Sequence, residues 1–165
     1  MIKINGLLGL LMISSSIIGQ NLLMIDEESR NAILKKHNHE RQILKIPDLV
    51  WSEELASFAE EWALQLAKED QGIHHRPPHH YGENIFWSSY VLPDYSDGVQ
   101  YWNDEKKIYR YKAINGKKEG TGHYTQVIWK RTGKVGCGCA QSATGTFFFV
   151  CNYDPPGNYM GQKPY

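Results

Sequence analysis

The 165-residue chain has the composition of one folded domain. Charged residues make up 22% of the chain and apolar residues 41%, which excludes a disordered protein. The 18 Lys and Arg residues balance the 18 Asp and Glu residues, and no basic stripe favours nucleic acid as a partner. Aromatic residues account for 12%, which indicates a densely packed core.

The first twenty residues predict a secretory signal peptide. Lys3 gives a positive start, residues 7–18 are mostly apolar, and Gly19 is a small residue at a suitable cleavage point. The apolar run is too short to span a bilayer. A buried N-terminal helix is the alternative. We therefore expect a signal peptide at 1–20, one domain at 21–165, and a secreted protein without an integral membrane segment.

Helices are predicted in the first two thirds of the chain. The first runs from Asp26 to Leu44, ahead of Pro47. A second follows the N-cap residue Ser52 and stops at Gly72. Its apolar stripe has helical spacing and comprises Leu55, Phe58, Ala59, Trp62, Ala63 and Leu66. A third helix extends from about 97 to 109.

Strands are predicted mainly in the last third of the chain. One short strand is expected at 83–87, and three more at 123–130, 134–140 and 146–153, separated by turn residues. In the first of these three, apolar and polar side chains alternate from His123 to Trp129. Helices that precede a β meander indicate an α+β fold.

The three cysteines allow one disulfide in an oxidising compartment. If 142–145 forms a hairpin turn, Cys139 falls opposite Cys151, and we expect this pair. A Cys137–Cys151 bridge is the alternative.

Histidines and glutamates are the candidate site residues. Imidazoles and carboxylates that converge on one cleft bind divalent metals and transfer protons near neutral pH. The candidates are His74, His75, His79, His80, Glu83, Glu105 and His123. His79 and His80 follow a Pro-Pro pair and are predicted to be solvated. The sequence has no Gly-x-Ser-x-Gly, no His-Glu-x-x-His and no phosphate-binding glycine loop.

Five ordered motifs stand out along the chain. They are His37-Asn38-His39-Glu40-Arg41, Asp48 to Ala56, Gly82-Glu83-Asn84-Ile85, Gly122 to Trp129 and Cys151 to Tyr159. Together they closely resemble the CAP superfamily of cysteine-rich secretory proteins, antigen 5 allergens and class 1 pathogenesis-related proteins, and the resemblance covers residues 27–165.

The resemblance implies a three-layer α-β-α sandwich with a central antiparallel sheet and a cleft lined by two His and two Glu. Glu83, Glu105 and His123 match three of these positions. His75 matches the fourth, with His74 as the alternative because Arg76 replaces the family's serine. The tetrad would bind Zn²⁺ or another divalent cation, or would be a hydrogen-bonded cluster that stabilises the cleft.

Other motif residues are expected to have structural roles. His37, Asn38 and Arg41 would tie the first helix to the core, and Asn84 and Gln126 would fix loops and strands.

The resemblance implies a secreted, monomeric binding protein rather than an enzyme. Its ligands would be sterols, fatty acids or other apolar molecules, with an extracellular protein as a further partner, and its role would be in defence, virulence or host interaction. One alternative is a metal-dependent hydrolase or peptidase, with metal on His75 and His123 and with Glu83 or Glu105 as base. Another is a module that docks a protein or a glycan.

Overall fold

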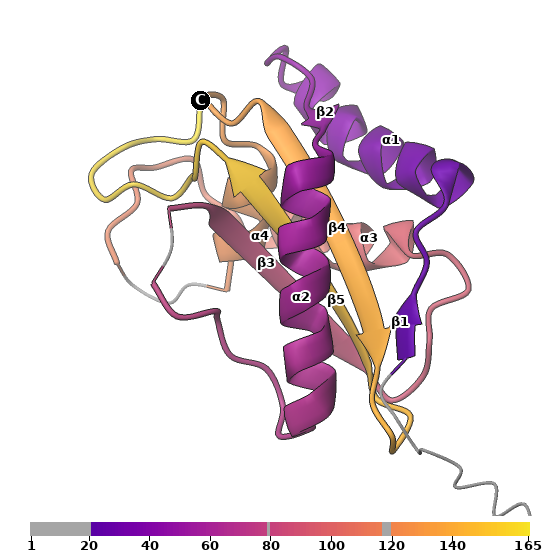
Figure 1. Cartoon of the computed structure of the whole chain (residues 1–165). Coiled ribbons are helices and arrows are strands. Elements are labelled where there is room, and N and C mark those ends of the chain that lie inside the picture. Colours follow the sequence, from indigo (N-terminus) through magenta and orange to yellow (C-terminus); the bar gives the residue numbers. More distant parts are fainter. Residues whose placement is uncertain (1–20, 79, 117–119) are drawn as a thin grey trace, which may run out of the picture.

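The fold has three layers, with helices on both faces of one sheet (Figure 1). The computed structural model describes residues 21–78, 80–116 and 120–165. The predicted α+β sandwich is confirmed. The predicted signal peptide at 1–20 and His79 lie outside the described residues. Within the described ranges, no helix combines the length and apolarity needed to cross a membrane.

The two longest helices begin directly after capping residues, and for α2 this is the predicted Ser52. Helix α1 spans Glu27–Ile43, and the side chain of Asp26 accepts a hydrogen bond from the Ser29 N–H at 2.8 Å. Helix α2 spans Glu53–Glu69 after the N-cap Ser52. It ends at Asp70, whose left-handed φ of 47° stops the helix two residues before the predicted Gly72.

The central sheet is built around a long hairpin. Strands β4 (Lys134–Gln141) and β5 (Phe147–Asp154) pair antiparallel, and β3 (Gly82–Ser88) pairs antiparallel with β5. Strand β1 (Asn21–Leu23) completes the order β1-β4-β5-β3. Strand β2 (Val50–Trp51) runs parallel to the start of β4.

Helix α2 covers one face of the sheet. Its apolar stripe packs on Phe148 and Val150 of β5 and Ile85 of β3. A methyl group on Gly136 or Gly138 would lie within 2.4 Å of the α2 backbone. These two glycines of β4 therefore allow the helix to approach the sheet closely.

The remaining helices cover the opposite face. They are α1, α3 (Ser96–Asp104), the short 3₁₀ helix η1 (Glu105–Lys107) and α4 (Gly122–Val127). The alternate β5 residues point toward this layer. One of them, Phe149, stacks on Trp102 of α3 with ring centroids 5.5 Å apart.

The strand predicted at 123–130 is wrong, because this segment forms helix α4. Alternation is uninformative here, since every side chain from Tyr124 to Trp129 is buried. Distant groups satisfy both ends of the short helix. The Glu105 carboxylate accepts the Tyr124 N–H, and the Arg41 guanidinium donates to the carbonyls of Val127 and Trp129.

The expected Cys139–Cys151 pairing is also wrong. The disulfide joins Cys137 to Cys151, and Cys139 is a buried free thiol. The hairpin pairs Gln141 with Phe147 across a loop of residues 142–146, and this register places Cys137 directly opposite Cys151. In this register Phe149 faces Cys139.

Candidate functional site: a cleft between two histidines

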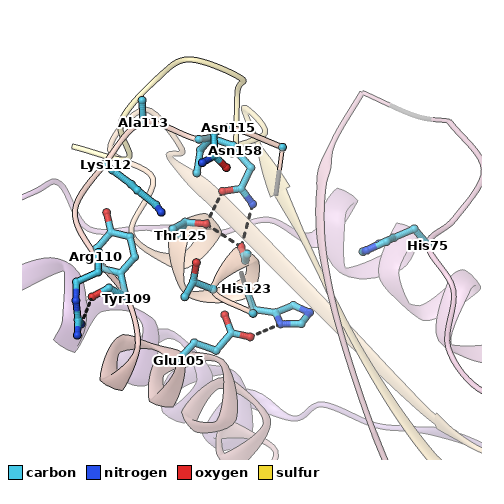
Figure 2. Close-up of a pocket in the computed structure, with 15 residues that line it drawn as sticks. His75, Glu105, Tyr109, Arg110, Lys112, Ala113, Asn115, His123, Thr125 and Asn158 are labelled. Atoms are coloured by element: carbon cyan, nitrogen blue, oxygen red, sulfur yellow. Dashed lines mark hydrogen bonds and ion pairs between the residues drawn. The ribbon is translucent and has the colours of Figure 1, made fainter. Parts of the chain in front are cut away.

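A cleft of about 420 Å³ lies beside the N-terminal end of α4 (Figure 2). The loop after η1 forms one wall, and His75 faces His123 from the other side. The lining residues are His75, Glu105, Tyr109, Arg110, Lys112, Ala113, Ile114, Asn115, Gly116, Gly120, Thr121, Gly122, His123, Thr125 and Asn158.

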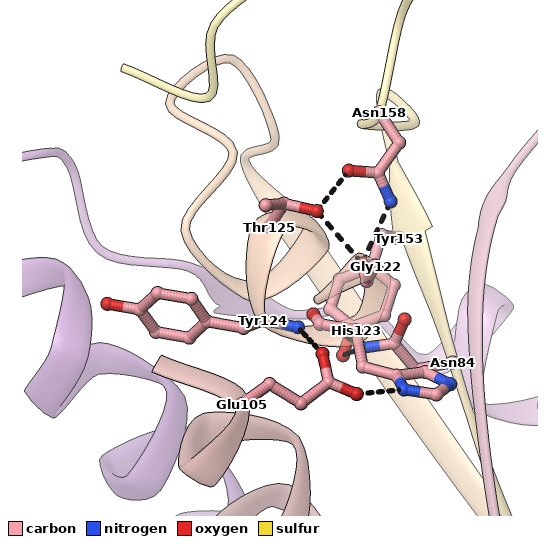
Figure 3. A network of polar contacts seen from close by, with 8 residues as sticks. All are labelled: Asn84, Glu105, Gly122, His123, Tyr124, Thr125, Tyr153 and Asn158. Carbon is pink, nitrogen blue, oxygen red and sulfur yellow. Dashed lines mark hydrogen bonds and ion pairs between the residues drawn. The ribbon is translucent and has the colours of Figure 1, made fainter. Parts of the chain in front are cut away.

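Glu105 fixes His123 on the floor of the cleft. One carboxylate oxygen lies 2.6 Å from His123 Nδ1, and the other accepts the Tyr124 N–H at 2.9 Å (Figure 3). The Trp102 ring stacks near the His123 ring, with centroids 6.1 Å apart. The imidazole is thus held by hydrogen bonding at one edge and by packing on one face.

A second set of contacts holds the start of α4. Asn158 donates to the Gly122 carbonyl at 2.9 Å and accepts from the Thr125 hydroxyl at 2.6 Å (Figure 3). The amide of Asn84 donates to the His123 carbonyl at 3.1 Å. His123 therefore rests on a backbone that is fixed from the sheet and from the C-terminal segment.

Glu83 orients the other histidine. Its Oε1 lies 2.7 Å from His75 Nδ1 and also accepts the Arg76 N–H at 3.1 Å. The Glu83 side chain is 3% exposed, whereas His75 is 69% exposed. The hydrogen bond that the Glu83 carboxylate accepts from His75 raises the pKa of His75, against the opposing effect of partial burial.

Arg76 anchors the loop that carries His75. Its guanidinium lies 3.7 Å from the centre of the Phe58 ring, donates to the Phe58 carbonyl at 2.8 Å and pairs with Glu61 at 3.0 Å. Sequence reasoning noted Arg76 only as a departure from the family pattern. Its contacts to α2 depend on the tertiary fold.

His74 lies apart from Glu83. Its imidazole is 3.4 Å from the Glu69 carboxylate, and its carbonyl accepts from Trp62. The structure therefore brings His75, and not His74, to Glu83. His80 is exposed.

The donor set fits a metal bound by imidazole. Each histidine engages a glutamate through Nδ1, and a neutral ring that donates from Nδ1 presents the lone pair of Nε2. His75 and His123 line the same cleft. Within the described part of the chain, no cluster of three or more His, Cys, Asp or Glu is arranged to hold an ion. The four-residue metal site stays a prediction.

The residues expected to be structural make buried contacts. Arg41 is fully buried and donates to four carbonyls, those of Pro47, Val127, Trp129 and Thr132. Asn38 bonds both the N–H and the carbonyl of Leu49. Gln126 accepts the Gly157 N–H.

His37 connects α1 to the sheet beneath the site. It is fully buried between the Ile33 carbonyl at 2.8 Å and the Tyr153 hydroxyl at 2.9 Å. Tyr153 also accepts from Asn84, which contacts the backbone of His123. Burial lowers the pKa of His37 to about 4, so the ring is neutral at physiological pH.

The sequence profile described as the cysteine-rich secretory protein family, CAP, matches residues 34–153. The chain belongs to the CAP family. The match spans the site from α1 through His75 and His123 to β5. The resemblance noted from the motifs is therefore confirmed.

Plant proteins are among the relatives of this CAP domain. The pathogenesis-related protein PR-1 of Medicago truncatula is 39% identical over 159 residues, covering 93% of this chain and 88% of the relative. The pathogenesis-related protein PRMS of Zea mays is 40% identical over 145 residues, covering 84% of each protein.

Solved structures share the fold. The crystal structure of NaASP2 with Zn²⁺ has a TM-score of 0.72 and 25% identity, covering 85% of this chain and 86% of that protein. The structure of BmVAL-1 has a TM-score of 0.71 and 24% identity, covering 85% of this chain and 82% of that protein. At this identity the likeness supports a shared fold only.

Proposed function

We propose that this CAP protein is secreted, acts in defence, and binds a divalent metal such as Zn²⁺ through the imidazoles of His75 and His123. The observation that carries the metal proposal is the matched pair of contacts, His75 to Glu83 at 2.7 Å and His123 to Glu105 at 2.6 Å. In both, Nδ1 faces the carboxylate. This is the arrangement that directs Nε2 of a histidine to a metal.

Defence and secretion are supported by the relatives. Proteins named pathogenesis-related from Medicago truncatula, Nicotiana tabacum and Zea mays align with most of this chain. The Cys137–Cys151 disulfide suits an oxidising compartment.

A bound ion would make the cleft a Lewis-acidic site for oxygen ligands. The protein would supply two imidazoles, while Glu83 and Glu105 orient them. We propose binding rather than hydrolysis because both oxygens of Glu105 and one oxygen of Glu83 already accept hydrogen bonds. If the wild type hydrolyses peptide or ester substrates and Glu105→Gln does not, the proposal of binding without hydrolysis is wrong.

Calorimetric titration with Zn²⁺ tests the metal proposal. We expect binding to the wild type, a large loss of affinity in His75→Ala and His123→Ala, and no change in His80→Ala, whose exposed ring lies outside the cleft. Equal heats of Zn²⁺ binding for the wild type and His123→Ala would refute the proposed metal site.

Sterol or fatty acid binding is a second candidate, favoured by an exposed aromatic surface. Tyr90 and Tyr101 are 57% and 54% exposed, and with Leu92 and Pro93 they line a groove of about 460 Å³. The Tyr101 ring is held in place by stacking on Phe86, at 4.8 Å between centroids. Asp97, Gln100 and Asp104 also line the groove, so its apolar side chains lie beside polar ones. An open groove of this size and mixed character suits a lipid that carries a polar group.

Radiolabelled sterol and fatty acid test this candidate. We expect saturable binding that falls in Tyr101→Ala and persists in Tyr159→Ala, an exposed tyrosine outside the groove. Absence of saturable binding for both lipid classes would reject it.

A further inference from the structure

Strand β3 forms one edge of the sheet. Among the described strands it pairs with β5 alone, and β1 lies at the opposite edge (Figure 1). Natural edge strands are often protected against further pairing by lysine, by proline or by a β-bulge. The sequence of β3, Gly82–Ser88, contains neither lysine nor proline, and its residues pair one to one with β5. This edge therefore lacks three common features that prevent another strand from pairing with it.

The register of the sheet shows which backbone groups of β3 point away from β5. The Val135 carbonyl accepts the Ser52 N–H on the side of β2, so Val135 and Tyr153 form a non-hydrogen-bonded pair between β4 and β5. The backbone groups of Tyr153 therefore point to β3, where Tyr153 pairs with the first residue of the strand. Because these directions alternate along a strand, the N–H and C=O groups of Ile85 and Trp87 point outward.

These outward groups are available for pairing. In the described part of the chain, no hydrogen bond outside the β3–β5 pairing involves the backbone of Ile85 or Trp87. Two N–H and two C=O groups thus face away from the sheet with the spacing of a strand. An extended chain at the usual distance of about 4.8 Å would satisfy all four.

A small space opens at this edge, with a volume of about 70 Å³. The Ile85 side chain packs on the α2 face of the sheet, whereas His123 lies on the opposite face, where Asn84 contacts its carbonyl. The space therefore lies at the edge of β3 and not on one of its faces. It adjoins the cleft of about 420 Å³, which shares two of its lining residues. The residues that line the small space are Ile73, His74, His75, Ile85 and His123.

Apolar side chains flank the outward groups on both faces of the sheet. Trp87 alternates onto the same face as Ile85 and is 50% exposed, and Ile73, which is 43% exposed, lines the small space with Ile85. On the other face, Phe86 stacks on the exposed ring of Tyr101. The side chains of an added strand would alternate between these two faces, so apolar side chains are favoured at successive positions.

The walls beside the edge favour a single extended chain over a second folded copy. His75 and its loop lie on one side, and the loop after η1 forms the far wall of the adjoining cleft (Figure 2). A second copy would bring the layers that cover its own sheet against these loops. A single strand needs only the spacing of about 4.8 Å between neighbouring strands.

We propose that β3 binds an extended peptide with apolar side chains by strand addition. The backbone of the peptide pairs with Ile85 and Trp87. Its side chains pack alternately against Ile73 on one face and against Phe86 and Tyr101 on the other. The inference goes beyond the proposed metal site, because strand addition needs no ion and uses backbone groups instead of imidazoles.

Hydrogen exchange of the full chain with the peptide Ac-Lys-Thr-Val-Ile-Val-Thr-Lys-NH₂ tests the proposal. The experiment is done in EDTA and followed by NMR. We expect exchange at the amides of Ile85 and Trp87 to slow by roughly tenfold or more when the peptide is bound. The amide of Phe86 should change little, because it already points to β5.

Two control peptides separate the backbone from the side chains. N-methylation of the three central residues keeps the apolar side chains and removes the N–H donors. Replacement of the same residues by serine keeps the donors and removes the apolar side chains. Each change should weaken binding by roughly tenfold, because strand addition uses both kinds of contact.

A matched pair of variants locates the contact at Trp87. Trp87→Pro removes the outward N–H, and proline is tolerated in an edge strand at such a position. Trp87→Thr loses the same side chain but retains the N–H. The proline variant should bind the peptide roughly tenfold more weakly than the threonine variant, while both bind Zn²⁺ as the wild type does. Circular dichroism confirms that each variant is folded.

Three results would overturn strand addition. They are equal affinities for the parent and the N-methylated peptide, equal affinities in the two folded variants, and unchanged exchange at both Ile85 and Trp87. If Trp87→Pro does not fold, the exchange pattern of the wild type decides. Dimers in sedimentation that protect the same amides without peptide would assign the edge to a second copy and reject the peptide.

The outcomes also separate this inference from the metal proposal. Peptide binding in EDTA, combined with no Zn²⁺ binding, would support strand addition and reject the metal. Zn²⁺ binding without peptide binding would reject strand addition alone.

Discussion

Nδ1 of His123 lies 2.6 Å from a carboxylate oxygen of Glu105, which is 18 residues earlier in the chain. Glu105 also accepts the Tyr124 N–H. One carboxylate therefore fixes both the imidazole and the first turn of the helix that carries it. On the other side of the cleft, Nδ1 of His75 contacts the carboxylate of Glu83 in the same way.

Glu105→Gln should weaken Zn²⁺ binding by about 10–100-fold, because an orienting carboxylate sets both the tautomer and the basicity of a metal-bound histidine. The matched control is Asp104→Asn. That neighbouring carboxylate contacts Lys107 and Gln100 instead of the cleft. Calorimetry on both variants checks this, and comparable losses in the two would contradict the role of Glu105.

Arg76→Ser should also weaken Zn²⁺ binding, while the fold is retained. The substitution removes the contacts with Phe58 and Glu61 that hold the His75 loop against α2. Arg76→Lys should restore part of the affinity through the Glu61 pair. The apparent pKa of His75, followed by NMR, should move toward its ordinary value in the serine variant. An unmoved pKa would refute the positioning role.

Arg41→Met should destabilise the protein by about 3–5 kcal/mol. The buried guanidinium donates to four carbonyls, three of which lie at or beyond the end of α4, and leaving buried acceptors without donors is costly. Chemical denaturation measures the loss. Arg131→Met, whose contact is on the surface, should change stability by less than about 1 kcal/mol. Similar losses in both would be inconsistent with the buried network.

The disulfide predicts a specific thiol count. Non-reduced protein should show one reactive thiol when denatured and almost none when native, because Cys139 is free and fully buried. Cys139→Ser should leave none in either state. Removing the bridge with Cys137→Ala, Cys151→Ala should cost about 3 kcal/mol, given the 14-residue separation. A thiol assigned to Cys137 by peptide mapping would disprove this pairing.

His37 predicts a pH dependence of stability. Its folded pKa of about 4 lies below the ordinary 6.5, so the unfolded chain binds the extra proton first. The contribution of neutral His37 to the free energy of unfolding is complete above pH 6.5. It decreases as the pH falls toward 4, by up to about 3 kcal/mol. His37→Gln should have a flatter profile over this window, and His39→Gln, exposed on the same helix, should follow wild type. Parallel profiles for wild type and His37→Gln would be the contrary result.

The sequence predicted the elements whose signals are local. Helices α1 and α2 begin at their capping residues, and β4 and β5 lie where the turn residues between them place them. Helix α4 was missed because groups distant in sequence, Glu105 and Arg41, satisfy its ends. The disulfide was mispaired because the turn residues alone did not fix the strand register, which places Cys137 and not Cys139 opposite Cys151.

The site residues were likewise predictable where a sequence motif marks them, and not where their contacts depend on the tertiary fold. Family motifs located Glu83, Glu105 and His123, and the structure places His75 rather than His74 beside Glu83. Arg76 was not assigned a role, because what it contacts is decided by how its loop folds back on α2.

The most direct test of the metal site is long-range ¹H–¹⁵N NMR of the histidine side chains during titration with Zn²⁺. The account predicts that Nε2 of His75 and of His123 shifts to a metal-bound position, while Nδ1 of each stays protonated and bonded to its glutamate. Unchanged Nε2 signals at both residues, or shifts confined to exposed rings such as His80, would contradict it.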